Sequence, residues 1–371
     1  MIPMNNPSLF TAQEMSARLQ AVREEMRQQN LSALITNKQA NVRYCTGFRG
    51  EPHTLFLTEK DAVLYTSFRT LPWAEDQTSL LSSSLELSIA DPNKNILSRI
   101  STDSLTIGMD QDLTHSNFIQ RSADFHPHQL IPSDPIERVR RVKSPTELQL
   151  IEQSQRLTES IFQTILPKME PGITERQAQG IILSEIAIRD EVDCYAFPPI
   201  VATGGNAWEI HHLPDQSPIK ENTMLLIDLG VVLQGYASDM TRTVCLGQAS
   251  SEMREVYEVV AHAQEAAIAC MLPGATTQEV DQAARKIISN AGYAKGFTHG
   301  LGHSIGLETH DPGLNLSPSS AKVELETGMV FTVEPGTYLA DAFGVRIEDI
   351  VAIGEESPTN LTKQNKDFVE L

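Results

Sequence analysis

The chain has few basic residues for its length. Its 29 lysines and arginines are outnumbered by 48 aspartates and glutamates, which gives a formal net charge of −19 at pH 7. Proteins that bind a phosphate backbone need basic patches, so this balance argues against nucleic acid as a partner. Part of the excess negative charge is expected to be carboxylate that a bound metal would neutralise.

Cysteines and long apolar runs are also scarce. The four cysteines (Cys45, Cys194, Cys245 and Cys270) are far apart and form no CxxC motif, so we expect reduced core residues rather than a set of disulfides. No stretch approaches the roughly 20 apolar residues that a membrane helix needs, which argues against a membrane partner. The N-terminal segment MIPMNNPSLFTAQEM lacks the basic and apolar regions of a secretory signal. We therefore expect a cytoplasmic protein.

At 371 residues, the chain should hold about two domains of roughly 150 residues each. In the first part, a helix is predicted over residues 12–30, and strands over 33–36, 54–58, 62–67 and 105–109. Helices that alternate with strands indicate an α/β domain. The Pro-Ser-Asp-Pro segment 132–135 is the strongest boundary signal. We therefore predict domains at residues 1–135 and 136–371.

The second part contains helix-start motifs that are separated by strand-like segments. Capping boxes at 144–147 (SPTE), 174–177 (TERQ) and 276–279 (TTQE) predict three helix starts. The first helix should end near residue 166 and the third near residue 291, and a further helix is predicted from about 251 to 270. The predicted fold class is α+β, with antiparallel strands that carry the functional residues and helices on the outside.

Two predicted β-hairpins place acidic residues opposite one another. A turn at Leu233-Gln234 would pair Asp228 with Asp239, and a looser turn around residue 341 would pair Glu334 with Glu348. Directly opposed like charges destabilise a sheet, and unpaired carboxylates among apolar residues are costly to bury. Two such pairs in one domain therefore predict bound cations.

Each acid also has an ordinary structural interpretation. Asp228 and Glu334 could end a strand, Asp239 could lie in a surface turn, and Glu348 could pair with Arg346. Buried acids in apolar segments are more often paired or metal ligands, so the four together favour a metal site.

Histidines supply the nitrogen ligand in this prediction. The segment 299-HGLGHSIGLETHD-311 has too many glycines for the zinc-binding HExxH helix, and its histidines at 299, 303 and 310 indicate backbone close to a bound group. His303 is the predicted ligand. The pair His211-His212 is equally compatible with a surface position and with a functional one.

The motifs together resemble those of the pita-bread metallopeptidases, which include methionine aminopeptidases, aminopeptidase P, prolidase and creatinase. The matching segments are IDLG with SDMTRT, HGLGHSIGLETHD, TVEPG and VRIED. The resemblance implies a pita-bread catalytic domain, in which a curved antiparallel sheet has outer helices. The segment 41-NVRYCTGF-48 resembles the smaller α/β creatinase-type N-terminal domain, which points to the proline-specific branch.

The resemblance implies a site with two divalent metal ions, most simply manganese, although cobalt or zinc could use the same ligands. It assigns the metal ligands to Asp228, Asp239, His303, Glu334 and Glu348. A water between the metals would be the nucleophile, and Glu334 would move its proton. His310 would steady the tetrahedral intermediate, His211 rather than His212 would lie on the substrate side, and Arg346 would hold a bridging carboxylate.

The implied activity is hydrolysis of peptides that have proline at the second position, by a homodimer. Many prolidases carry an arginine soon after the second active-site histidine. Here Leu314 lies near that position with no basic residue beside it, which favours an aminopeptidase that acts before proline. Residues 197–199 (Phe-Pro-Pro) and the His211 loop would form the wall for the proline ring. The alternatives are an Xaa-Pro dipeptidase (prolidase), a metal-free peptide-binding scaffold, and a creatinase-like hydrolase of a small guanidino compound.

Overall fold

The computed structural model describes residues 10–50, 54–79, 85–89, 96, 98–100 and 104–371. The described chain divides into two compact units, and the boundary between them in the sequence falls between Arg140 and Arg141. The predicted boundary after residue 135 falls at the start of helix α6 (Pro135–Arg140), which packs against helices of the first unit. Among the described helices, none is both long and apolar enough to cross a bilayer.

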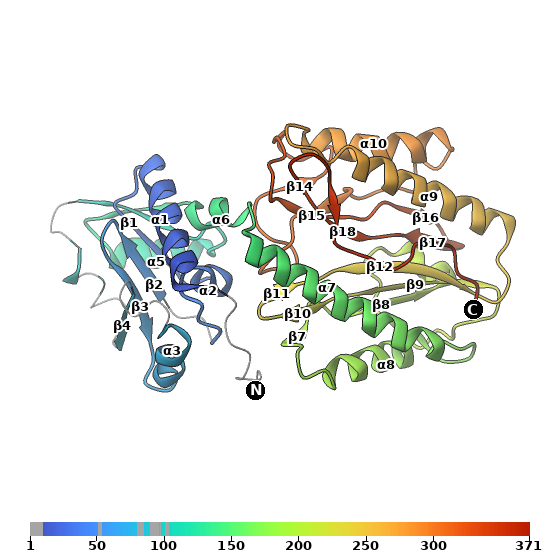
Figure 1. Cartoon of the computed structure of the whole chain (residues 1–371), viewed down its shortest axis with the longest axis horizontal. Helices are drawn as coiled ribbons and strands as arrows, with labels where there is room; N and C mark the ends of the chain where they lie inside the picture. Colours follow the sequence, from blue (N-terminus) through green and yellow to red (C-terminus); the bar gives the residue numbers. More distant parts are fainter. Residues whose placement is uncertain (1–9, 51–53, 80–84, 90–95, 97, 101–103) are drawn as a thin grey trace. The chain divides into compact units, whose positions relative to one another are not determined.

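The first unit is an α/β domain (Figure 1). Its six-stranded sheet has the order β4-β3-β2-β1-β5-β6, in which β1–β2 and β2–β3 pair antiparallel and the other neighbours pair parallel. The strands predicted over residues 54–58 and 62–67 are present as β2 and β3 and pair as a hairpin. Besides α6, its elements are α1 (Ala12–Gln28), β1 (Ala33–Thr36), α2 (Gln39–Thr46), β2 (Thr54–Thr58), β3 (Ala62–Thr66), α3 (Leu71–Gln77), β4 (Glu86–Ile89), β5 (Thr106–Met109), α5 (His115–Asp124) and β6 (Gln129–Pro132).

The second unit places two pairs of helices outside a set of antiparallel strands (Figure 1). All three predicted capping boxes form, at Ser144, Thr174 and Thr276. The helices are α7 (Pro145–Ile165), α8 (Glu175–Ala187), α9 (Ser251–Ala269) and α10 (Thr277–Asn290), with short 3₁₀ turns η2 (Leu166–Lys168) and η3 (Gly204–Trp208).

The strands of this unit form several small antiparallel ladders. Strand β9 lies between β8 and β12, and β18 lies between β15 and β19. The strands are β7 (Cys194–Tyr195), β8 (Ile200–Thr203), β9 (Thr223–Leu229), β10 (Val231–Leu233), β11 (Tyr236–Ala237), β12 (Met240–Leu246), β13 (Gly302–His303), β14 (Asn315–Leu316), β15 (Val330–Val333), β16 (Gly336–Leu339), β17 (Phe343–Arg346), β18 (Asp349–Ala352) and β19 (Thr359–Asn360).

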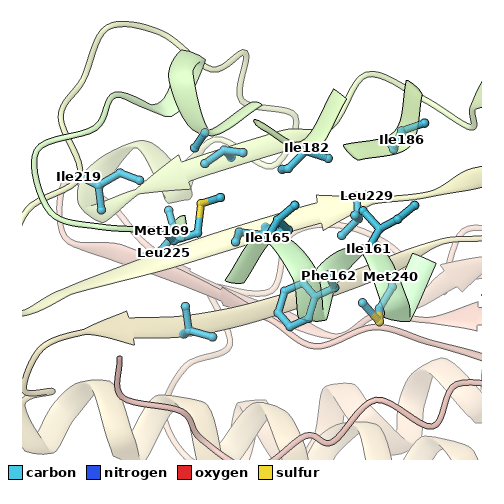
Figure 2. Packing of buried hydrophobic residues seen from close by; sticks show 14 of the residues in the cluster. Ile161, Phe162, Ile165, Met169, Ile182, Ile186, Ile219, Leu225, Leu229 and Met240 are labelled. Carbon is cyan, nitrogen blue, oxygen red and sulfur yellow. The ribbon is translucent and has the colours of Figure 1, made fainter. Parts of the chain in front are cut away.

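Alternation along the strands separates the apolar core from the acids. On β9, Leu225, Ile227 and Leu229 pack against α7 and α8, as Figure 2 shows for the packing around Leu225 and Leu229. Because successive side chains point to opposite faces, Asp228 points away from these helices. Replacing one of the fully buried core side chains by alanine should cost about 2–5 kcal/mol.

The second helix pair repeats this arrangement. Phe331 and Val333 of β15 and Val351 of β18 pack with residues of α9 and α10 in a separate apolar cluster. The residue after Val333 is Glu334, which therefore faces away from α9 and α10. Each helix pair thus covers the outer face of its strands, and the acids lie on the inner faces.

The first acidic hairpin has a different register from the one predicted. Its turn falls at Gln234-Gly235, both of which have positive φ (44° and 81°), as a two-residue type I′ turn requires. The prediction placed Leu233 in the turn, where a bulky residue would be strained. Asp228 therefore pairs with Thr241 and not with Asp239.

The error leaves the face of the sheet unchanged. Only a shift by an odd number of residues would move a side chain to the other face, so Asp239 still lies on the same side as Asp228. In the second hairpin, Gly336 pairs with Arg346 and Val333 with Asp349. These flanking pairs place Glu334 opposite Glu348, as predicted.

The cysteine prediction is right for two positions and wrong for two. Cys45 and Cys245 are buried, whereas Cys194 and Cys270 are exposed. Cys194 lies on the short strand β7, both of whose residues are exposed, and Cys270 directly follows α9.

Candidate metal centre

The inner faces of the two hairpins bring the predicted ligands together. His303 Nε2 lies 3.6 Å from Asp239 Oδ2 and 3.4 Å from Glu334 Oε1. Asp239, His303 and Glu348 each offer a ligand atom within 4.8 Å of those of the others. These distances suit ligands around a shared cation rather than a set of direct hydrogen bonds.

Arg346 links Asp228 to this group of ligands through hydrogen bonds. Its Nη2 donates to Asp228 Oδ2 at 2.7 Å, and its Nε donates to Thr241 Oγ1 at 3.0 Å. The Thr241 hydroxyl in turn donates to Glu348 Oε2 at 2.6 Å. One buried guanidinium therefore orients Asp228 directly and Glu348 through Thr241.

The hydrogen bonds of His303 determine which nitrogen can bind a metal. Its Nδ1 lies 3.1 Å from the carbonyl oxygen of Ser304, which can only accept, so Nδ1 carries the proton. The unprotonated Nε2 then faces Asp239 and Glu334. Burial lowers the pKa of His303 to about 3, which keeps the ring neutral and its lone pair available.

The positive charge of Arg346 compensates only part of the charge of the four carboxylates. Burial, and then the neighbouring carboxylates, raise the pKa of both Asp239 and Glu348 well above the ordinary range, and burial raises that of Glu334 to about 7. Asp228 Oδ1 and Asp239 Oδ1 are buried without a hydrogen-bond partner among the described residues. Orphaned buried carboxylate oxygens, in a group that also offers one unprotonated imidazole nitrogen, fit divalent cations, which these donors would bind.

A cavity of about 860 Å³ opens onto these residues. Phe197, Pro198, Pro199 and Ile200 form part of its wall, as do residues 210–214 of the loop that carries His211. His310 also lines the cavity, and its ring centre lies 4.0 Å from that of His303. The pocket thus combines an apolar wall with polar groups at one end, which is typical of small-ligand sites.

His299 has a structural role that its position in the motif did not reveal. Its Nδ1 donates to the Gly300 carbonyl at 2.7 Å, so its Nε2 accepts from the Tyr338 hydroxyl at 3.0 Å. Tyr338 accepts in turn from Arg346 Nη1 at 3.0 Å. Burial lowers the pKa of His299 to about 4, consistent with a neutral link that fixes Arg346.

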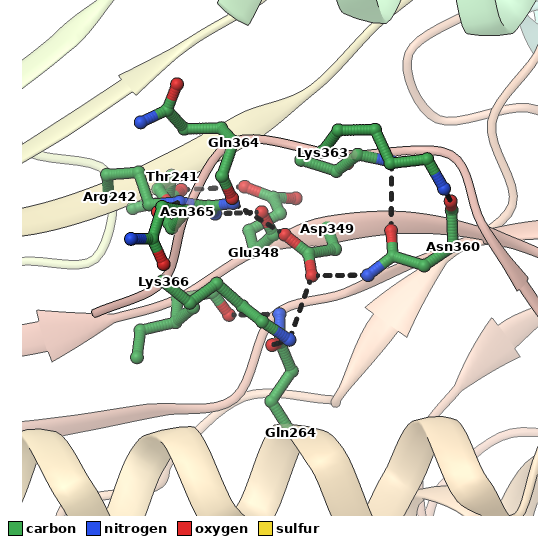
Figure 3. A network of polar contacts seen from close by, with 12 residues as sticks. Thr241, Arg242, Gln264, Glu348, Asp349, Asn360, Lys363, Gln364, Asn365 and Lys366 are labelled. Atoms are coloured by element: carbon green, nitrogen blue, oxygen red, sulfur yellow. Dashed lines mark hydrogen bonds and ion pairs between the residues drawn. The ribbon is translucent and has the colours of Figure 1, made fainter.

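A second polar network holds the backbone of Glu348 and the side chain of the next residue, Asp349 (Figure 3). Arg242 donates to the Glu348 carbonyl at 2.6 Å and to Asp349 Oδ1 at 2.8 Å. Asp349 also binds Asn360 at 2.8 Å and Lys366 at 3.3 Å. The sequence did not predict these contacts, because the partners lie in a C-terminal segment without regular spacing.

A buried ion pair holds the loop between His303 and His310. Lys143 Nζ lies 3.2 Å from Asp311 Oδ2, and both side chains are 1% exposed. Asp311 Oδ1 also accepts from the Glu308 amide at 3.2 Å. A lysine that precedes the helix α7 cap and an aspartate that follows His310 were not singled out, since each residue type is common at a domain surface.

Family models match both units. Residues 149–355 match metallopeptidase family M24, and residues 18–142 match the creatinase/prolidase N-terminal domain. An uncharacterised peptidase of Bacillus subtilis is 31% identical over 371 residues, which covers 95% of this chain and all of that protein.

Two solved structures of enzymes with different activities are similar to this one. A Xaa-Pro dipeptidase from Bacillus anthracis has a TM-score of 0.89 and 26% identity, and covers 96% of this chain and 100% of its own. An X-Pro aminopeptidase from Thermotoga maritima has a TM-score of 0.85 and 27% identity, with coverage of 95% and 99%. The predicted fold, with a pita-bread catalytic domain after a creatinase-type domain, is confirmed. The chain belongs to metallopeptidase family M24, and it is a metallopeptidase of the proline-specific branch.

Proposed function

We propose that this enzyme is an Xaa-Pro aminopeptidase, which removes the residue before proline from the N-terminus of a peptide. The observation that carries the proposal is the convergence of all five expected ligand residues on one cavity with an apolar wall. Both a dipeptidase and an aminopeptidase have similar structures, so the choice between them depends on this chain's own cavity.

The cavity favours peptides longer than a dipeptide. A dipeptidase must bind the free carboxylate of its substrate, which calls for a cation. Among the described residues that line the cavity, Arg346 is the only lysine or arginine, and it is 2% exposed and already bound to Asp228. Leu314, near the position where many prolidases have arginine, is buried in an apolar cluster.

The donor set would hold two divalent cations. Asp228, Asp239, His303, Glu334 and Glu348 would be the ligands, and manganese suits their oxygen-rich chemistry. When bound, such cations activate water and polarise the scissile carbonyl. We also propose a homodimer, an expectation that rests on the family resemblance alone.

The remaining chemistry belongs to side chains. Glu334 would take the proton of the attacking water and pass it to the proline nitrogen, which must be protonated to leave as a secondary amine. His310 and His211, both exposed in the cavity, would donate hydrogen bonds to the carbonyl oxygen as negative charge develops on it. Phe197 and its neighbouring prolines would pack against the proline ring.

The test is hydrolysis of matched Xaa-Pro and Xaa-Pro-Yaa peptides with manganese and with a chelated control. Metal-dependent cleavage of the tripeptide is expected. Cleavage of the dipeptide alone would instead establish a prolidase, and would mean that a group other than the described cavity residues binds the substrate carboxylate. Absence of metal-dependent cleavage of either would favour a binding scaffold or a different substrate.

A further inference from the structure

His211 lies on a loop without regular secondary structure. Residues 209–217 contain no helix or strand. His211 is exposed, and Leu213 beside it is 79% exposed. Ile210 packs against an apolar cluster and Pro214 is buried, but His211 and Leu213 between them gain no such packing. Their position therefore depends on the polar contacts of this part of the loop.

A buried carboxylate on α8 binds both the loop and the segment that precedes it. Glu175, the first residue of α8, is 0% exposed. Its Oε1 accepts from the Thr203 amide at 2.8 Å and from Asn206 Nδ2 at 3.0 Å. Its Oε2 accepts from His212 Nε2 at 2.7 Å and from the Asp215 amide at 3.2 Å. The helix N-terminus also favours a negative charge at this position.

His212 lies between two carboxylates. Its Nε2 binds Glu175 at 2.7 Å, and its Nδ1 binds Glu209 Oε2 at 2.9 Å. Ionised carboxylates can only accept, so both ring nitrogens donate, as they do only in the imidazolium form. Burial opposes this charge, but the hydrogen bonds to Glu209 and Glu175 outweigh it and raise the pKa of His212.

The neighbouring charges support the same state. Glu175 comes from α8, whereas Glu209 and Asp215 come from the loop itself. Arg176, the next residue of α8, binds the Pro214 carbonyl at 3.0 Å. The group of Glu175, His212 and Asp215 has the composition of a metal site, but both ring nitrogens and both Glu175 oxygens are already bonded within the network. A proton on the imidazole, not a cation, therefore completes it.

We propose that His212 is a positioning residue, which as an imidazolium clamped between Glu175 and Glu209 holds His211 against the wall of the catalytic cavity. The part of this proposal that concerns substrate rests on the proposed function, because it takes His211 to contact the substrate. The contact of His212 with Glu175 is buried, whereas its contact with Glu209 is open to solvent, since the Glu209 side chain is 63% exposed. These two contacts together are called the clamp. Glu209→Gln can therefore weaken the clamp without disturbing the buried half.

Two measurements on the metal-free protein test the clamp independently of activity. Nitrogen-15 NMR of labelled histidines should show both ring nitrogens of His212 protonated at pH 7, with the signal identified by its loss in His212→Asn. In Glu209→Gln, the midpoint of the His212 titration should fall by about one pH unit. Exposed Glu265 on α9 provides the control, and Glu265→Gln should leave the midpoint unchanged.

Amide hydrogen exchange then reports the position of the loop. Above the lowered midpoint, exchange in residues 209–215 should be on the order of tenfold faster in Glu209→Gln than in wild type, with no change elsewhere. A neutral His212 at pH 7, or unchanged exchange in this loop, would overturn the proposal. Either result can be read even if the wild-type enzyme cleaves no Xaa-Pro peptide, in which case the proposed function alone has failed.

Kinetics of the manganese-loaded enzyme connect the clamp to catalysis. If His211 is displaced by about 1 Å in His212→Asn, kcat/KM should fall on the order of 100-fold at unchanged metal content. In Glu209→Gln, the loss should grow as pH rises through the His212 midpoint and vanish below it. A loss that is independent of pH would indicate a merely structural contact and contradict the positioning role.

Discussion

Removing the charge of Glu334 should have opposite effects on the metal-free and the metal-bound enzyme. The Glu334 side chain is 16% exposed, and burial raises its pKa from an ordinary value of 4.5 to about 7. In the metal-free protein the ionised carboxylate is therefore a source of instability. Glu334→Gln keeps the shape of the side chain and removes the charge.

The sign follows from proton binding. Because the pKa of Glu334 is higher in the folded than in the unfolded state, the metal-free protein takes up a proton on folding, and its stability falls as pH rises from 4.5 to 7. The difference between these values corresponds to about 3 kcal/mol at pH 8. Metal-free Glu334→Gln should thus be more stable than wild type by about 3 kcal/mol at pH 8 and equal to it at pH 4.5.

Urea denaturation in the presence of a chelator, followed by circular dichroism from pH 4.5 to 8, measures this difference. The buried histidines titrate in the same way in both proteins, so their effect on stability cancels in the difference between the variant and wild type. Exposed Glu326 near strand β15 provides the control, and Glu326→Gln should show no such trend. With manganese the order should reverse, because the amide is the poorer ligand. If metal-free Glu334→Gln were no more stable than wild type at pH 8, then Arg346 would be enough to compensate the charge of the buried carboxylates, and the reasoning about this site would be wrong.

Three further predictions concern the residues around the site. Arg346→Lys, which cannot reproduce the fork of contacts to its partners, should weaken manganese binding by about 10–100-fold, as measured by calorimetry on chelator-stripped protein. Lys143→Met leaves a buried charge on Asp311 and should lower the free energy of unfolding in urea by about 3–5 kcal/mol. The double variant with Asp311→Leu should recover most of this stability. If it recovers none, the single variant lost stability through packing and not through the unpaired charge. Gln234→Asn, at a positive φ that asparagine tolerates better, should stabilise the protein by up to about 1 kcal/mol in thermal unfolding, and a loss would contradict the type I′ turn.

The helices of the catalytic domain were predictable because their start signals are local. Ser144, Thr174 and Thr276 each accept a hydrogen bond from a residue three positions later, a contact that sequence spacing alone specifies. The register of the first hairpin was less accessible. Moving the turn by a single residue, from Leu233-Gln234 to Gln234-Gly235, changed the partner of Asp228, although the face on which it lies was safe.

The acids themselves were conspicuous for a physical reason. A carboxylate inside an apolar strand is costly, so Asp228 and Glu334 stand out against their apolar neighbours in the sequence alone. The residues that position these acids are not conspicuous in the sequence. Thr241 and Tyr338 are residue types at home in any strand, and their importance arises only because Arg346 reaches both.

The two histidines of the 211–212 pair show where sequence reasoning reaches its limit. Their sequence contexts are nearly the same, yet His211 is exposed in the cavity and His212 is 6% exposed and bound to a carboxylate 37 positions away. Nothing in the local pattern anticipates Glu175, because a glutamate in the first turn of a helix has an ordinary explanation in the helix dipole. Residues whose chemistry is unusual for their sequence context, such as acids in an apolar strand, can therefore be identified as those that carry out a reaction. The residues that position them become visible only when the fold brings distant segments together.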